Sequence, residues 1–217
     1  MNPLIPPGVY PPQEDTSLLA AALSEEPLPP DARVLDVGTG SGALALEAAR
    51  RGAEVTAVDV SWRAVCAVWV NARRSRLPVR VRRGDLFAPV RGQRFDLILA
   101  NPPYVPAPDG RGVPRGRARN WDGGHDGRLV VDRICREAPR LLRPGGVLLM
   151  VHSALNDPDR TLAQLRAAGL KAAVTRSSRI AFGPVLSARA EWLRHRGLLG
   201  PSEEKEELVV VRAELPD

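Results

Sequence analysis

The chain has 217 residues, a length that fits one α/β domain with short extensions. No apolar run approaches the roughly 20 residues that a membrane-spanning helix needs, and the N-terminus lacks the basic and apolar segments of a secretory signal, so we expect a cytoplasmic protein without a membrane segment. The formal net charge is +6, with 29 arginines against two lysines, a skew that admits a nucleic-acid or acidic partner without specifying one.

The N-terminal residues 3–12 are rich in proline and predict an extended arm. Residues 13–16 then lead into the apolar run 17–23, which predicts a short helix with acids in its first turn. From Arg33 onward, short apolar strands alternate with helices, which is typical of a mainly parallel sheet. We expect strands at 33–37, 54–59, 79–83, 95–100, 146–152, 170–176 and 207–213. We expect helices at 42–51, 62–75, 127–142 and 158–168.

Two stretches interrupt this alternation. Residues 105–124 are rich in Gly, Pro and Arg and predict a long loop, a feature that is usually functional or disordered in a compact domain. Residues 183–198 carry apolar residues at helical spacing and predict an extra amphipathic helix before the last strand, as a lid, a partner surface or a structural addition. The loop contains four arginines that we expect to face a substrate: Arg111, Arg115, Arg117 and Arg119.

A glycine-rich loop follows the first strand. Residues 34–42 comprise an apolar strand, an acid and three glycines at alternate positions, Gly38, Gly40 and Gly42. Glycines let the backbone approach a ligand closely and adopt a positive φ. The same loop also fits GxGxx(G/A), with Ala43 in the last place, so a dinucleotide-binding oxidoreductase is a competing interpretation.

Three aspartates at strand ends favour a different cofactor. Asp36 lies just before the glycines, where its charge would repel a pyrophosphate and attract an α-ammonium or sulfonium. Asp59 can accept both hydroxyls of a ribose, and Asp85 can accept the exocyclic amine of an adenine. Each aspartate alone could be a turn-forming residue, but together they predict S-adenosylmethionine.

The tetrapeptide Asn101-Pro102-Pro103-Tyr104 follows the apolar run 95–100. Ligands in open α/β sheets bind beyond the carboxyl ends of the strands, so this is where chemistry is expected. The prolines fix φ and donate no backbone N–H, which leaves carbonyl groups to face a substrate. The Asn101 oxygen and the Pro102 carbonyl provide two acceptors for an –NH2 group, with Tyr104 as a flat ring beside them. The tetrapeptide therefore predicts a substrate with an amide or an exocyclic amine.

The combination of DVGTGSG, VDVS, GDLF and NPPY resembles the class I S-adenosylmethionine-dependent methyltransferases. Within that group the chain is most similar to the HemK-type enzymes that modify the glutamine of the Gly-Gly-Gln motif in translation release factors. The opening, residues 9–16, and the segment from Trp121 to Arg133 match the short branch that lacks an N-terminal helical domain. The resemblance runs from about residue 9 to 182, and residues 183–205 are an insertion relative to the shortest members.

The resemblance implies a seven-stranded, Rossmann-like α/β fold, mostly parallel with an antiparallel last strand. Residues 1–30 would form an arm and short helix that complete the cofactor site, and residues 31–217 the methyltransferase domain. It assigns cofactor contacts to Thr16, Asp36, Gly38, Gly40, Asp59, Asp85, Leu86 and Asn101. The resemblance also implies which residues would bind the glutamine amide of the substrate: Asn101, Pro102, Pro103, Tyr104 and Trp121. Of these, Asn101, Pro102 and Tyr104 would be catalytic. The release factor is the implied partner, and short-branch relatives commonly need a small activator subunit.

Other functions stay open at this point. An adenine-N6 methyltransferase on DNA or RNA could use the same tetrapeptide and the basic charge, although no target-recognition domain for base flipping is evident. A catalytically inactive methyltransferase-like binding module is a further alternative. The arginines of residues 73–83 are expected to form a solvated basic face.

The remaining chemically active side chains do not suggest a metal or a covalent mechanism. Three scattered histidines and the isolated Cys66 and Cys135 do not have zinc-ligand spacing. We expect both cysteines to be small buried side chains. Trp62 and Trp69 lie seven residues apart on one helix face and are expected in the core.

Overall fold

The computed structural model describes residues 3–108 and 116–217. Its centre is a seven-stranded sheet in the order β3-β2-β1-β4-β5-β7-β6. Neighbouring strands are parallel except at β7, which runs antiparallel to both β5 and β6. The strands are β1 (Arg33–Val37), β2 (Glu54–Asp59), β3 (Val79–Arg83), β4 (Phe95–Ala100), β5 (Leu142–Ser153), β6 (Lys171–Ala181) and β7 (Lys205–Glu214). The predicted fold class is therefore confirmed.

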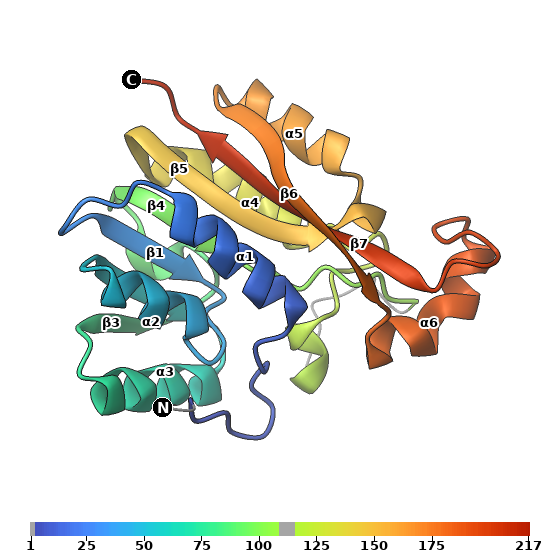
Figure 1. The fold of residues 1–217 in the computed structure, drawn as a ribbon, viewed down its shortest axis with the longest axis horizontal. Coiled ribbons are helices and arrows are strands. Elements are labelled where there is room, and N and C mark those ends of the chain that lie inside the picture. The colour runs from blue at the N-terminus through green and yellow to red at the C-terminus, as the bar shows by residue number, and fades with distance from the viewer. Residues whose placement is uncertain (1–2, 109–115) are drawn as a thin grey trace.

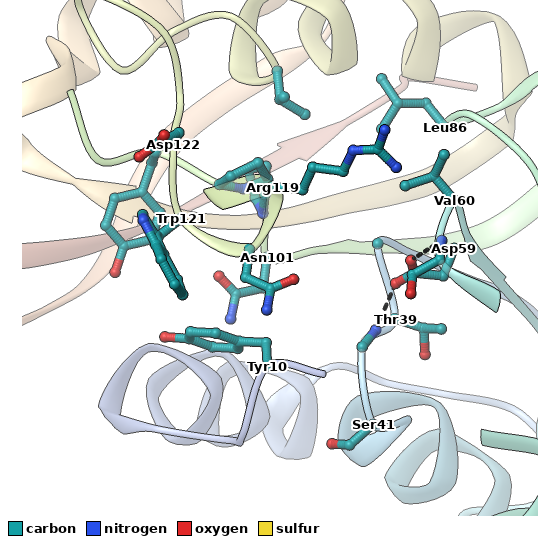
Figure 2. Close-up of a pocket in the computed structure, with 18 of the residues that line it drawn as sticks. Tyr10, Thr39, Ser41, Asp59, Val60, Leu86, Asn101, Arg119, Trp121 and Asp122 are labelled. Atoms are coloured by element: carbon teal, nitrogen blue, oxygen red, sulfur yellow. Dashed lines mark hydrogen bonds between the residues drawn. The ribbon is translucent and has the colours of Figure 1, made fainter. Parts of the chain in front are cut away.

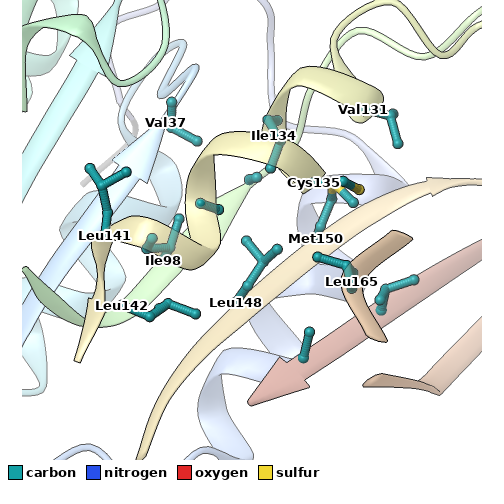
Figure 3. Packing of buried hydrophobic residues seen from close by; sticks show 14 of the residues in the cluster. Val37, Ile98, Val131, Ile134, Cys135, Leu141, Leu142, Leu148, Met150 and Leu165 are labelled. Atoms are coloured by element: carbon teal, nitrogen blue, oxygen red, sulfur yellow. The ribbon is translucent and has the colours of Figure 1, made fainter. Parts of the chain in front are cut away.

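Helices cover both faces of the sheet (Figure 1). They are α1 (Glu14–Glu25), α2 (Ala43–Arg50), α3 (Trp62–Ser75), α4 (Val131–Glu137), α5 (Pro158–Ala167) and α6 (Pro184–His195). Side chains alternate between the two faces of a strand, so Leu97 and Leu99 of β4 pack with α1, α2 and α3, whereas Ile98 packs with α4 and α5. Figure 3 shows this second core, with Ile134 of α4 and Leu165 of α5 beside the sheet.

Several element boundaries differ from the sequence prediction. Helix α1 runs from Glu14 to Glu25, so it begins ahead of the apolar run at 17–23 and carries the expected acids, Glu14 and Asp15, in its first turn beside Thr16. The helix expected over 127–142 is only the seven residues of α4 followed by a 3₁₀ turn, Ala138–Leu141. A proline at position 139 explains the break, because proline has no N–H to continue an α-helix.

The outer surface of α3 corrects two predictions. Trp62 and Trp69 are 60% and 52% exposed, so the expectation that both lie in the core is wrong. Cys66, between them on the same stripe, is exposed as well, whereas Cys135 is buried as expected. The small residues of α3 face the sheet instead, because Ala64, Ala67 and Val68 let the helix pack closely against β2 and β3.

The long segment between β4 and α4 is held in place through glycines. The Gly127 backbone approaches Tyr104 and Asn156 so closely that any Cβ would overlap them. The next residue, Arg128, is buried and donates to the Asn156 and Asp157 carbonyls. Gly127 and Arg128 therefore fix this segment against the turn that follows β5, which explains why a glycine and an arginine stand at these positions.

Candidate active site

A cavity of about 870 Å³ lies at the carboxyl ends of β1, β2 and β4, and the N-terminal arm and the β4–α4 segment form its other walls. Every residue predicted for the site lines this cavity, together with side chains from the arm. Figure 2 shows two ends. Asp59, Val60 and Leu86 lie at one end, and Tyr10 and Trp121 lie at the other, with Asn101 near them.

Asp36 is the buried carboxylate beneath the glycine loop. Its Oδ2 accepts hydrogen bonds from the Thr39 hydroxyl at 2.6 Å and from the Ala45 N–H at 3.1 Å. Burial raises its pKa to about 6, and the two hydrogen bonds oppose that rise. Gly38 and Gly40 adopt φ of 73° and 56°, which side chains rarely tolerate, so the loop backbone stays open to the cavity.

Asp59 holds the same loop from the end of β2. Its Oδ2 accepts from the Gly40 N–H at 3.0 Å, and its Oδ1 accepts from the Ser61 N–H at 2.8 Å. Burial raises the pKa of this carboxyl, against the effect of these hydrogen bonds. Each carboxylate oxygen can accept more than one hydrogen bond, so acceptor capacity remains for the two hydroxyls of a ribose.

Asp85 lies in a more exposed position at the rim. It makes a bidentate ion pair with Arg133 of α4, at 3.1 and 2.8 Å. Leu86, the next residue, has a positive φ of 46°, a strained conformation for a leucine. Val60 completes this end with an exposed apolar side chain that the sequence analysis missed, although its place directly after Asp59 was the available signal.

At the other end, Asn101 is oriented by helix α1. Its Nδ2 donates to the Thr16 hydroxyl at 3.2 Å, and that hydroxyl donates to Asp15 Oδ1 at 3.1 Å. A carboxylate only accepts hydrogen bonds, so the Thr16 proton points to Asp15 and the Thr16 oxygen must accept from Asn101. The Asn101 Oδ1 is thereby left as the acceptor available to the cavity.

Asp15 also binds two tyrosine hydroxyls. Tyr10 and Tyr104 both donate to its Oδ2, at 2.8 and 3.4 Å. Burial and the adjacent carboxylate raise the pKa of both phenols, so both remain protonated. Tyr104 is the more buried ring, whereas Tyr10 and Trp121 are only partly buried and border the cavity. Asp15 and Tyr10 were not predicted as site residues. Asp15 belongs to the site because it accepts from Thr16 and Tyr104, and Tyr10 because it donates to Asp15.

The wall that carries Trp121 is tied to helix α6. Arg189 of α6 donates to the Pro106 carbonyl at 2.9 Å and pairs with Asp122 at 2.6 Å. The Val105 N–H donates to the Trp121 carbonyl at 2.7 Å, which fixes Trp121 beside the tetrapeptide. Of the four arginines expected near the substrate, Arg117 and Arg119 line the cavity, and Arg111 and Arg115 lie outside the described residues.

The cavity fits S-adenosylmethionine on the chemistry of its walls. Asp36 supplies a buried anion near the glycine loop, Asp59 supplies acceptors for hydroxyls, and Val60 and Leu86 supply apolar surface for an adenine ring. A Cβ on Gly38 or Gly40 would project from a backbone that borders the cavity. Within residues 3–108 and 116–217, no three His, Cys, Asp or Glu side chains are grouped to bind a metal ion. Those same residues contain no helix long and apolar enough to cross a membrane.

Sequence comparisons place these features among known proteins. A family model described as "Methyltransferase small domain" matches residues 7–110. A Methanocaldococcus jannaschii protein named as a protein N5-glutamine methyltransferase is 32% identical over 185 residues, which cover 85% of this chain and 92% of that protein. A release factor glutamine methyltransferase of Gloeobacter violaceus is 42% identical over 145 residues, 63% of this chain and 50% of that protein. The chain thus aligns with about half the length of this second relative.

A solved structure has a similar fold. The complex of E. cuniculi Mtq2 with Trm112, described as responsible for methylation of the eRF1 translation termination factor, aligns with a TM-score of 0.67. The alignment covers 96% of this chain and 99% of that chain at 24% identity, a level at which the likeness shows the fold.

Proposed function

The chain belongs to the protein N5-glutamine methyltransferase family of S-adenosylmethionine-dependent enzymes, and from that premise we propose that it methylates the glutamine amide of the Gly-Gly-Gln motif in a translation release factor. The observation that carries the proposal is the orientation of Asn101. Its Nδ2 is held by Thr16, so its Oδ1 can accept an N–H of a planar –NH2 group. The names of the Gloeobacter relative and of the solved complex support the choice of a release factor.

A carboxamide nitrogen is a poor nucleophile because its lone pair is delocalised, so the enzyme must position it. S-adenosylmethionine, when bound, supplies an electrophilic methyl group on its sulfonium. Asn101 Oδ1 and the Pro102 carbonyl would each accept one N–H of the glutamine amide and so direct the nitrogen toward that methyl. Precise alignment of two reactants can supply on the order of 7–11 kcal/mol of the acceleration.

The same two acceptors favour the transition state. Positive charge develops on the amide nitrogen as its bond to the methyl forms, and preoriented oxygen atoms stabilise it. One N–H becomes acidic at that stage, so no strong base is needed before methyl transfer. Pro102 and Pro103 contribute by lacking N–H donors, which would otherwise repel the –NH2 group. We assign stacking on the flat amide to Tyr10 and Trp121, because the Tyr104 ring is largely buried.

The partners follow from the same family. The solved neighbour was determined with Trm112, and by that likeness we propose that this chain also works with a small activator subunit. Its release-factor substrate would place the enzyme in the cytoplasm.

The test is labelled methyl transfer from S-adenosylmethionine to a purified release factor. A matched release factor with Gln→Ala in the Gly-Gly-Gln motif, a DNA duplex and total RNA serve as parallel acceptors. We expect label on the intact release factor alone. Label on nucleic acid with none on the release factor contradicts the proposal and supports an adenine methyltransferase.

Asn101→Ala and Asn101→Asp refine this test. Neither side chain can both donate a hydrogen bond to Thr16 and present an oriented acceptor to the substrate, as the Asn101 amide does. We expect the loss of at least 100-fold in kcat for each, in line with the removal of a preoriented polar group from an active site. S-adenosylhomocysteine binding, measured by calorimetry, should change by less than tenfold. Turnover near that of the unmodified enzyme contradicts the assigned role.

A further inference from the structure

Helix α3 and the edge strand β3 that follows it are strongly basic. Residues 60–83 contain seven arginines and no aspartate or glutamate, so this stretch alone carries more positive charge than the whole chain's net +6. All seven are exposed, and one of them, Arg80, has an acidic neighbour, Glu54 at 3.5 Å. The seven residues are Arg63, Arg73, Arg74, Arg76, Arg80, Arg82 and Arg83.

Two exposed tryptophans, Trp62 and Trp69, lie among these arginines. Trp62, Cys66, Trp69 and Arg73 follow at spacings of four, three and four residues, which place them on one face of the helix. This face points away from the buried alanines of α3, and Figure 1 shows α3 at the periphery of the molecule, beside the edge strand β3. Large apolar side chains that are exposed together on one face mark an interaction site more than single exposed residues do.

Each tryptophan is paired with a cation. The Arg73 guanidinium lies 4.6 Å from the centre of the Trp69 ring, and the Arg83 guanidinium lies 4.8 Å from that of Trp62. Both contacts are cation–π interactions, which hold the arginines beside the rings. A ring with an adjacent guanidinium offers a nucleobase a stacking surface and offers the neighbouring phosphate a bidentate donor.

From this arrangement we propose that the face formed by Trp62, Trp69, Arg73, Arg74 and Arg83 binds single-stranded RNA without sequence preference. Phosphates would contact the arginines, and unpaired bases would stack on the two tryptophans. An acidic protein surface would match the charge, but the pairing of each tryptophan with a guanidinium matches the alternation of base and phosphate in a single strand. The choice of RNA over DNA rests on the proposed function, since a release factor acts on the ribosome, where the nucleic acid is RNA.

The RNA would lie beside the active site. Trp62 and Arg83 border the cavity, whereas Trp69, Arg73 and Arg74 do not. Substitutions at the latter three positions therefore probe RNA binding without touching the cofactor or the glutamine. The RNA-binding face and the methyl-transfer reaction can thus be tested separately.

The experiment measures fluorescence anisotropy of a labelled U12 RNA with the full chain at 50 to 300 mM salt. We expect Trp69→Ala to weaken binding about tenfold, the typical contribution of one stacked base, and Trp69→Phe to retain most of it. Arg73→Gln with Arg74→Gln should lower the slope of log affinity against log salt by about 1.4, because each phosphate contact to a single strand contributes about 0.7.

The matched control removes the same charge elsewhere. Arg136→Gln with Arg179→Gln also replaces two exposed arginines, on α4 and β6, and should leave U12 affinity within twofold. Circular dichroism melts check that every variant is folded. Labelled dT12 and polyglutamate are run as competing ligands.

Four results overturn the proposal. They are equal losses in the control and in the α3 double variant, no effect of Trp69→Ala, binding of dT12 tighter than U12, and polyglutamate competing as well as unlabelled U12. The last would identify an acidic protein as the partner of this face. Methylation of an isolated release factor should stay within twofold in the Trp69 and Arg73/Arg74 variants, so failure of RNA binding is distinguishable from failure of the proposed activity.

Discussion

Thr16 links helix α1 to Asn101, for which we propose a catalytic role, and its substitution tests the orientation of Asn101 directly. Thr16→Val keeps the shape of the side chain and removes the hydroxyl that accepts from Asn101 Nδ2 at 3.2 Å and donates to Asp15 at 3.1 Å. The Asn101 amide then has no hydrogen bond that distinguishes its two ends. Either the nitrogen or the oxygen can face the substrate.

The size of the effect follows from these two contacts. A neutral hydrogen bond such as that from Asn101 to Thr16 contributes about 0.5–1.5 kcal/mol, and this is the energy that favours the productive orientation of the amide. A further, smaller loss comes from the Asp15 carboxylate. Its Oδ1 keeps the hydrogen bond from the Thr16 N–H at 2.5 Å, so only part of the about 1.5–3 kcal/mol of a charged hydrogen bond is lost. We expect a total near 2 kcal/mol in the barrier, which is about 30-fold in kcat.

The assay is single-turnover methylation of a release factor at saturating S-adenosylmethionine, with S-adenosylhomocysteine affinity measured in parallel. Thr16→Ser retains the hydroxyl and should recover at least a third of the rate, whereas Thr16→Val should not. A Thr16→Val rate within twofold of the unmodified enzyme refutes the reasoning. An equal loss in Thr16→Ser would mean that the threonine methyl group, rather than the hydroxyl, is what the site requires.

Three further predictions concern Asp36 of the cavity, Glu206, a buried carboxyl on β7, and Arg189 of α6. Burial raises the pKa of Asp36 to about 6, so calorimetric affinity for S-adenosylmethionine should fall as the pH drops below 6 and the carboxylate is neutralised; Asp36→Asn should bind weakly and without this pH dependence. Burial also raises the pKa of Glu206 from 4.5 to about 7, so the folded state binds this proton more tightly than the unfolded state. The contribution of the bound proton to folding stability is therefore lost as the pH rises from 4.5 through 7. Glu206→Gln should raise Tm at pH 8 and leave it unchanged at pH 4.5. Arg189→Met removes the contacts with Pro106 and Asp122, and should raise KM for the release factor severalfold with unchanged S-adenosylhomocysteine affinity; a lower affinity for that ligand instead would contradict a role limited to the substrate wall.

The sheet and the glycine loop were predictable because their determinants are local in sequence. Short strands of five to six residues alternate with α-helices from β1 to β3, and the three glycines lie directly at the end of β1. Asp59 follows Gly40 by 19 residues within one β–α–β unit, so the parallel pairing of β1 and β2 places it at the same edge of the sheet. The sequence pattern alone therefore identifies this end of the cavity.

The orientation of Asn101 was not predictable in the same way. Its partner Thr16 is 85 residues away, and Tyr104 meets Asp15 across 89 residues. The sequence showed these residues as motifs but contained no signal for which atoms would meet. The prediction that Trp62 and Trp69 are buried was wrong for a related reason. Hydrophobic spacing on a helix predicts that two residues share a face, but not whether that face turns to the sheet or to solvent.

This contrast separates the two halves of the site energetically. Asp36 and Asp59 are fixed by backbone hydrogen bonds of consecutive β–α turns, which form whenever β1 and β2 pair. Asn101 depends instead on α1 docking against β5, β6 and β7, because Asp15 and Thr16 lie in the first turn of α1. A change that loosens the arm should therefore reduce the transfer rate while the cofactor end stays intact, and a change in the glycine loop should do the reverse. On the proposed mechanism, helix α1 would therefore act on the reaction through the amide of Asn101, and the tetrapeptide would need α1 in place to present its acceptors to the substrate.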